Sequence, residues 1–158
     1  DINNLIDDLK IFSWEASEIL LYYSKILKNG KDKNIILKNN KPSLIVGTPG
    51  GSTIITSVLQ TILNVYEFDM NVQEATEAPN INSFQMRSSF GYHENRPGDL
   101  LLHDSTPSFI RKELRKKGYK LQFRSKTSGP INAIFFDNIN KTFQGGSSDF
   151  GEDYGIAW

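Results

Sequence analysis

The chain has 158 residues, of which 38% are hydrophobic and 23% charged, with 18 basic and 18 acidic side chains. This composition indicates a folded protein with a buried core, and its balanced charge argues against binding to nucleic acid or to an anionic membrane surface. No apolar stretch of the sequence is long enough to span a bilayer. With no cysteine and only two histidines, we expect no disulfide, no clustered metal site and no bound cofactor.

The first part of the chain is predicted to contain a helix, a hairpin and a second helix. Apolar residues at helical spacing predict a helix over residues 14–28, and Gly30 follows it as a stop signal. Residues 34–37 and 43–47 are short, apolar and branched, and the polar segment between them predicts a β-hairpin. Apolar residues then recur with helical period from Ile54 to Val65.

The next part is predicted to contain two helices separated by a polar loop. Asn71 and Glu74 have the spacing of a capping box, which predicts a short helix that ends before Pro79. A loop is expected over residues 80–98. Ser105 or Thr106 is predicted to cap a further helix. This helix has Pro107 in its first turn and Gly118 after its end.

Three strands are predicted to complete the chain. Apolar and polar residues alternate over residues 119–124, which is typical of a half-buried strand, and residues 131–137 and 141–145 are predicted as two further strands. Helices and antiparallel strands occupy separate runs of the sequence, which favours an α+β layered fold over a doubly wound parallel sheet. We expect residues 1–158 to form a single domain.

The turn Gly47-Thr48-Pro49-Gly50-Gly51 lies between a predicted strand and a predicted helix. Consecutive glycines let backbone N–H groups converge on one point, where they can bind a phosphate, a carboxylate or the oxyanion of a tetrahedral intermediate. A phosphate loop is disfavoured because Ser52-Thr53 stands where a Lys-Ser/Thr pair is required. The alternative is that the glycines only permit a tight turn.

Several separated segments resemble the small subunit of gamma-glutamyltransferases. In that family a strand hairpin ends in a glycine turn of the same kind, and a helix then leads to a segment like Asn71-Val72, Glu74-Ala75 and Ala78-Pro79 of this chain. The segments at residues 105–120 and 145–158 are similar to the family's Pro-containing helix and to its C-terminus. The resemblance covers residues 34–158, whereas residues 1–33 are poorly matched.

The resemblance implies a fold, an activity and a site. The fold is an αββα sandwich of the N-terminal-nucleophile hydrolase type, present in part, with antiparallel sheets flanked by helices. The activity is transfer or hydrolysis of gamma-glutamyl groups from small donors such as glutathione, by an autocatalytically cleaved precursor. Gly50 and Gly51 would form the oxyanion hole through their backbone N–H groups. The partner would be a large subunit or the upstream part of the same precursor, in the periplasm or secreted.

The chain departs from the family pattern in its first residues. The family's nucleophile is a threonine at the new N-terminus of the small subunit, and no counterpart precedes the matched region, so the nucleophile is unknown. The segment ending at Asp8 is similar to the family's Asn-Asn-Gln/Glu-Met-Asp-Asp-Phe, which assigns Asp8 to the substrate's α-amino group, although a solvated carboxylate explains it equally well. The family's serines that hold the substrate carboxylate would fall near residues 29–32, where this chain has none.

Three functional hypotheses follow from these observations. The first is a gamma-glutamyltransferase-like enzyme whose nucleophile lies outside this chain. The second is a catalytically inactive paralogue that acts as a binding or structural module. The third is a related cephalosporin acylase-like amidase, in which altered amino-acid-binding residues are expected. His93 and His103 are interpreted as surface groups, and the basic residues of the segment 111–117 as a solvated helix end.

Overall fold

The structure, a computed structural model, describes residues 35–51, 53–85, 87–88 and 91–151. The chain divides into two compact units, residues 1–43 and 44–158. The helix predicted over residues 14–28, the proposed Asp8 contact and the segment near residues 29–32 all lie outside the described residues. Within the described parts of the chain, no helix is both long enough and apolar enough to cross a bilayer.

The predicted hairpin is confirmed and has a tighter turn than expected. Strand β1 (Ile35–Lys38) and strand β2 (Lys41–Gly47) are joined by Asn39 and Asn40, with φ of 53° and 60°. Asparagine tolerates this left-handed backbone, which two-residue hairpin turns require. The polar residues Lys41 and Pro42, expected in the loop, therefore belong to the second strand.

Two helices follow the glycine turn, close to their predicted positions. Helix α2 (Thr53–Tyr66) buries one face, formed by Ser57, Val58, Thr61, Ile62 and Leu63. Helix α3 (Val72–Glu77) has the predicted capping box, in which the Asn71 side chain accepts a hydrogen bond from the Glu74 N–H at 2.9 Å and the Glu74 carboxylate accepts one from the Asn71 N–H at 3.0 Å. These reciprocal bonds satisfy two donors that the helix itself leaves unpaired.

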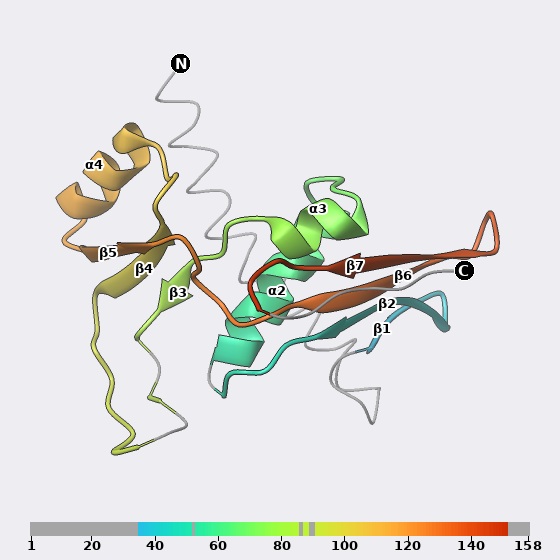
Figure 1. Ribbon diagram of the computed structural model, residues 1–158, viewed down its shortest axis with the longest axis horizontal. Helices are drawn as coiled ribbons and strands as arrows, with labels where there is room; N and C mark the ends of the chain where they lie inside the picture. The colour runs from blue at the N-terminus through green and yellow to red at the C-terminus, as the bar shows by residue number, and fades with distance from the viewer. Residues whose placement is uncertain (1–34, 52, 86, 89–90, 152–158) are drawn as a thin grey trace. The chain divides into compact units, whose positions relative to one another are not determined.

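A four-stranded sheet with the order β1-β2-β6-β7 carries the glycine turn at the end of β2 (Figure 1). Strands β6 (Asn132–Asp137) and β7 (Thr142–Ser147) form an antiparallel hairpin, and β6 pairs antiparallel with β2 so that Val46 lies opposite Ala133. Helix α3 packs on β6, β7 and α2. Val46 is fully buried and Ala133 nearly so. The end of β2, just before the glycine turn, is therefore held in a packed core.

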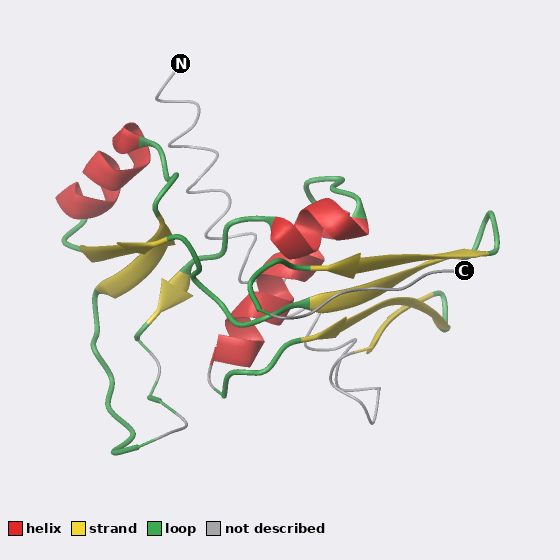
Figure 2. Cartoon of the chain, in the orientation of Figure 1, coloured by secondary structure: helices red, strands yellow, loops and turns green. Residues whose placement is uncertain are grey.

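A second, three-stranded sheet has the order β3-β4-β5 (Figure 2). It contains β3 (Asn82–Ser83), β4 (Asp99–His103) and β5 (Lys120–Arg124), and helix α4 (Ser108–Lys116) connects β4 to β5. Strands β4 and β5 are parallel, because the helical crossover returns the chain to the end of the sheet at which β4 begins. The α+β class is confirmed, the β4–β5 pair is parallel where antiparallel strands were expected, and β3 and β4 were not predicted.

The predicted cap of α4 is wrong. Its N-cap residue is Pro107, with no side-chain hydrogen bond to the helix. The hydroxyl of Thr106 instead donates to the His103 carbonyl at 2.6 Å. Thr106 therefore closes the turn after β4 and is not available as a cap. The predicted stop is confirmed at Gly118, whose φ is 88°.

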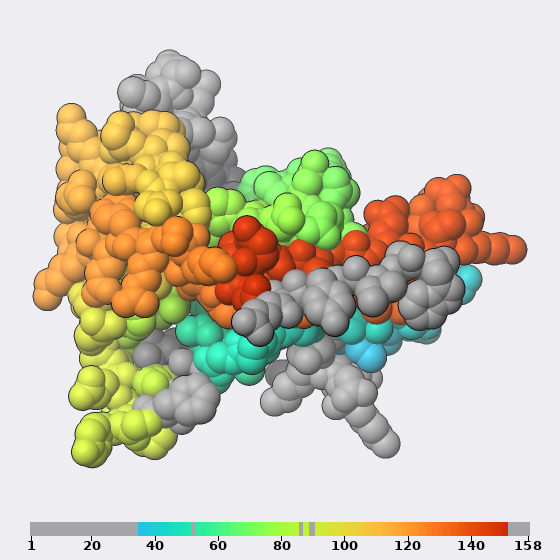
Figure 3. Space-filling view, viewed as in Figure 1, coloured from blue at the N-terminus to red at the C-terminus, as the bar shows by residue number. Residues whose placement is uncertain are grey.

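The turn between β6 and β7, in orange and red at the right of Figure 3, begins with an aspartate whose pKa is shifted. The Asp137 carboxylate accepts hydrogen bonds from the Asn140 N–H at 2.9 Å, the Asn140 amide at 2.7 Å and the Ile139 N–H at 3.0 Å. These bonds, those from Asn140 foremost, hold the pKa of Asp137 below its ordinary value of 3.8. Because the folded-state pKa is the lower one, the stabilisation is complete above the ordinary pKa and is lost as the pH falls through the lowered pKa.

We therefore expect the Asp137 carboxyl carbon to titrate below pH 3.8 in an NMR titration of the folded protein. The backbone amide signals of Ile139 and Asn140 should shift with the same midpoint, because both amides donate to this carboxylate. Titration of Asp137 at or above its ordinary pKa would show that the turn does not hold the carboxylate.

Candidate functional site

The glycine turn after β2 has a backbone that most side chains disfavour. Gly50 has φ of 135° and Gly51 has φ of 61°, both in the positive range that favours glycine. A side chain at Gly50 would also meet Thr53, since a Cβ built there lies 2.5 Å from the Thr53 Oγ1 atom. Gly50 is therefore required by the shape of the turn, and Gly51 has a backbone conformation that most other residues adopt only with strain.

The carbonyl groups of the two glycines accept hydrogen bonds from the first residues of helix α2. The Gly50 carbonyl accepts from the Thr53 N–H at 3.3 Å and from the Thr53 hydroxyl at 2.8 Å, and the Gly51 carbonyl accepts from the Ile54 N–H at 3.2 Å. Neither glycine donates its N–H to another described residue. These donors thus lie at the positive end of a helix, where an anion is stabilised by the N–H groups and by the helix dipole together.

A later loop, residues 127–129, packs against the glycine turn. A Cβ built at Gly129 would lie 3.3 Å from the Pro49 carbonyl oxygen and 3.6 Å from the Pro49 ring. This contact is tighter than most side chains tolerate, so the absence of a side chain at Gly129 allows the two segments to approach. The approach brings the loop that follows β5 to the turn that follows β2.

A pocket of about 370 Å³ lies next to this contact. The cross-strand neighbours Asn82, Leu101 and Gln122 form part of its wall, one from each strand of the three-stranded sheet. Its remaining lining residues come from the first turn of α2, from the loop before β4, and from the end of β5 and the loop after it: Thr53, Phe84, Arg96, Arg124, Lys126, Thr127, Ser128 and Gly129. The pocket has the size of a small-molecule site and carries three cationic side chains.

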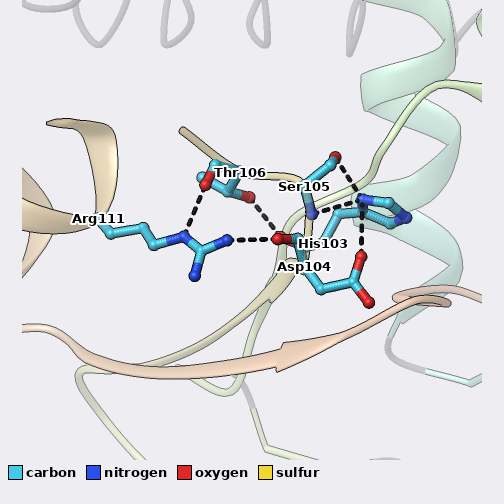
Figure 4. A network of polar contacts seen from close by, with 5 residues as sticks. All are labelled: His103, Asp104, Ser105, Thr106 and Arg111. Carbon is cyan, nitrogen blue, oxygen red and sulfur yellow. Dashed lines mark hydrogen bonds and ion pairs between the residues drawn. The ribbon is translucent and has the colours of Figure 1, made fainter. Parts of the chain in front are cut away.

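The two histidines of the sequence have structural partners. The His93 Nδ1 atom lies 2.9 Å from the Ser88 carbonyl oxygen. The His103 Nδ1 atom lies 2.6 Å from the Ser105 hydroxyl and 3.5 Å from the Asp104 carboxylate (Figure 4). A Ser-His-Asp catalytic arrangement needs the serine and the carboxylate on opposite ring nitrogens. Here both contact the same nitrogen, so the cluster closes the turn after β4.

The basic residues of α4 also have local contacts. The Arg111 guanidinium lies 4.3 Å from the Phe123 ring centre, and its nitrogens donate to the carbonyls of Thr106 and Asp104 (Figure 4). Arg115 lies 5.8 Å from the same ring. These contacts fasten α4 to one face of β5. Among the described residues, no group of three His, Cys, Asp or Glu side chains is arranged to hold a metal ion.

The comparisons with known proteins identify the family. The sequence profile of gamma-glutamyltranspeptidase matches residues 34–158. The chain belongs to the gamma-glutamyltranspeptidase family. It is 34% identical to the glutathione hydrolase proenzyme of Bacillus subtilis over 144 residues, a match that covers 91% of this chain and 22% of the relative. The chain thus spans less than a quarter of the length of that relative.

Two further relatives extend the comparison. The crystal structure of an acivicin-inhibited gamma-glutamyltranspeptidase is 35% identical, with a TM-score of 0.62, over 75% of this chain and 59% of that chain. The acylase ACY 1 proenzyme of a Pseudomonas species is 30% identical over 101 residues, which are 64% of this chain and 16% of that protein. The αββα fold of the N-terminal-nucleophile type expected from the sequence is therefore present in part, as predicted.

The site residues predicted from the sequence separate into two groups. Gly50 and Gly51 lie together in the turn with the predicted backbone, and their assignment to an oxyanion hole stays a prediction. Asp8 lies outside the described residues. The cationic pocket was not predicted. The alternation of polar residues along β5 predicts a strand with one solvent-exposed face. It does not identify the residues from other segments that complete the pocket.

Proposed function

We propose that this chain supplies the oxyanion-binding turn of an enzyme that transfers or hydrolyses gamma-glutamyl groups of small donors such as glutathione. The turn at Gly50 and Gly51 is the observation that carries the proposal. It presents two N–H groups at the start of α2, and neither donates a hydrogen bond to another described residue. Charge that develops on a carbonyl oxygen during acyl transfer needs donors of this kind, fixed in place before the reaction.

The proposed reaction is a two-step acyl transfer. A nucleophile attacks the γ-carbonyl carbon, and the carbonyl electron pair moves to the oxygen, which the Gly50 and Gly51 N–H groups stabilise. Collapse of this intermediate breaks the C–N bond, and the departing amine takes up the proton that the nucleophile lost on attack. Water or a second amine then attacks the acyl-enzyme through the same oxyanion site, and its proton passes to the nucleophile as the nucleophile is released. An acceptor amine gives transfer, and water gives hydrolysis.

The nucleophile and the partner are also part of the proposal. The family's N-terminal threonine would come from the upstream part of the same precursor, which would also provide the large subunit. The name proenzyme, given to the Bacillus subtilis relative, supports a processed precursor. Asp8 is proposed to bind the α-amino group of the donor, because of its place in the segment that is similar to the family's substrate-binding motif.

A related amidase is the second candidate, because the acylase ACY 1 proenzyme is also a relative. The test uses the longest polypeptide that contains this chain, assayed with a gamma-glutamyl anilide and with the glutaryl anilide, which lacks only the α-amino group. We expect amine release from the gamma-glutamyl donor and two subunits by intact mass. Preference for the glutaryl donor would instead indicate an acylase. Cleavage of neither donor would overturn the proposal in favour of an inactive paralogue.

A further inference from the structure

We infer that the pocket on the β3-β4-β5 sheet is a carboxylate-binding subsite for the substrate that reacts at the Gly50–Gly51 turn. The inference rests on the proposed function for the identity of that substrate. Its support comes from the pocket itself: an excess of positive charge, an arginine side chain without a partner among the described residues, and direct contact with the glycine turn.

The charge of the pocket favours an anion. Arg96, Arg124 and Lys126 line it. Of these three cations, only Arg96 forms an ion pair among the described residues, with the Asp99 carboxylate at 3.5 Å. The Lys126 ammonium donates to a neutral group, the Asp149 backbone carbonyl, at 2.9 Å, so its charge is not neutralised. Two cations therefore remain uncompensated, and a guanidinium can grip a carboxylate through two parallel hydrogen bonds.

The register of the sheet places Arg124 in the pocket. Side chains alternate between the two faces of a strand. Phe123 points to the face that α4 covers, where Arg111 and Arg115 lie over its ring. Arg124 and Gln122 point to the opposite face and line the pocket. The Arg124 guanidinium has no hydrogen-bond or ion-pair partner among the described residues, so its five donors are free for a ligand.

Polar groups of the loop after β5 add to the site. Thr127 lines the pocket and is 4% exposed, and its hydroxyl is the only buried side-chain polar atom of the described residues that lacks a hydrogen-bond partner. Buried polar groups are nearly always paired in folded proteins. The Thr127 hydroxyl is thus left without a partner among the described residues, in a residue that lines a cationic pocket.

The pocket is continuous with the glycine turn. Thr53 lines the pocket and its hydroxyl donates to the Gly50 carbonyl at 2.8 Å. On the other side, Gly129 lines the pocket and approaches the Pro49 carbonyl. One small ligand can therefore place a carbonyl at the turn and a carboxylate in the pocket. The carboxylate can belong to the acyl donor or to the amine acceptor, and the experiment separates these sources.

The experiment compares charged and neutral substrates in the active, longer polypeptide. The acceptors are glycylglycine and glycylglycinamide, and the donors are a gamma-glutamyl anilide and its α-carboxamide. Arg124→Met is expected to lower the preference for the charged member of one pair about tenfold or more, measured as the ratio of KM values, because it removes a charge-assisted contact. Arg124→Lys should restore part of the preference. Lys120→Met, on the same strand and outside the lining of the pocket, should leave both ratios intact.

The two pairs identify the source of the carboxylate. A change confined to the acceptor pair places the acceptor in the pocket, and a change confined to the donor pair places the donor there. Unchanged ratios in Arg124→Met, or an equal change in Lys120→Met, would overturn the inference.

A calorimetric titration separates this inference from the proposed function. Glycylglycine and glutamate, the acid that hydrolysis of the gamma-glutamyl anilide releases, are titrated into the wild type and Arg124→Met, with inorganic phosphate as the competing anion. Binding of either carboxylate that is lost in Arg124→Met supports the subsite, even if no gamma-glutamyl turnover is found and the proposed function falls. Tighter binding of phosphate than of both carboxylates would overturn it.

Discussion

Gly51→Val is expected to lower turnover by about 100-fold to 1,000-fold in the processed, longer polypeptide, which is the usual loss when one oxyanion donor is misplaced. Gly51 has φ of 61°, a conformation that a β-branched residue adopts only with strain. Relief of that strain would rotate the backbone N–H away from the substrate carbonyl, and the new side chain would obstruct its approach. The measurement is kcat with a chromogenic gamma-glutamyl anilide, alongside the thermal midpoint.

Gly118→Val is the matched control for backbone strain. Gly118 also has a positive φ, 88°, and a Cβ there would meet no atom within 4 Å. It lies after α4 and does not line the pocket. Both variants should lower the midpoint by a few degrees, in keeping with a strain of about 1–3 kcal/mol. Only Gly51→Val should lose turnover. Equal losses in the two variants, or none in either, would make the glycine turn purely structural.

Gly146→Ala is expected to destabilise the protein by about 1–3 kcal/mol or more, because it forces an atom into a filled space. A Cβ at Gly146 would lie 2.5 Å from the Val72 carbonyl oxygen, 2.8 Å from its carbon and 3.0 Å from the Gln73 nitrogen. These are backbone atoms at the start of α3, so they cannot rotate away. Strand β7 and α3 would have to separate, with a fall of several degrees in the thermal midpoint.

The neighbouring glycine provides the control for this variant. Gly145 lies in the same strand, is exposed, and has no atom within 4 Å of a built Cβ. Gly145→Ala should leave the thermal midpoint close to that of the wild type, since β7 gains a side chain that points into solvent. If the two variants unfold at the same temperature, the close approach of β7 to α3 does not contribute to stability.

Local signals in the sequence predicted much of the fold. The hairpin, α2 and the capping box at Asn71 and Glu74 were found because each depends on residues close together in the chain. Strand β4 was missed because its centre, Leu100–Leu102, is buried on both faces and so has no alternation. Its partner β5 is parallel and lies beyond a helix, and no local pattern reports such a pairing.

The candidate site was predictable only in part, for the same reason. Two adjacent glycines between a strand and a helix indicate an exposed backbone turn, and the left-handed geometry at Gly50 and Gly51 agrees with this. The pocket is assembled from Thr53, from the three-stranded sheet and from the loop after β5. Each of these residues is ordinary by itself, and their proximity is a property of the tertiary structure.

The connection from β4 through α4 to β5 has a consequence for the order of folding. Strands β4 and β5 are separated by a short crossover. Strands β2 and β6 also pair, but most of the described chain lies between them in the sequence. Closing a longer loop costs more chain entropy, and distant pairings form more slowly. The β4-α4-β5 segment is therefore expected to form first. The part of the pocket that β4 and β5 form would then fold before the glycine turn packs against it. The complete site would form only when β2 pairs with β6.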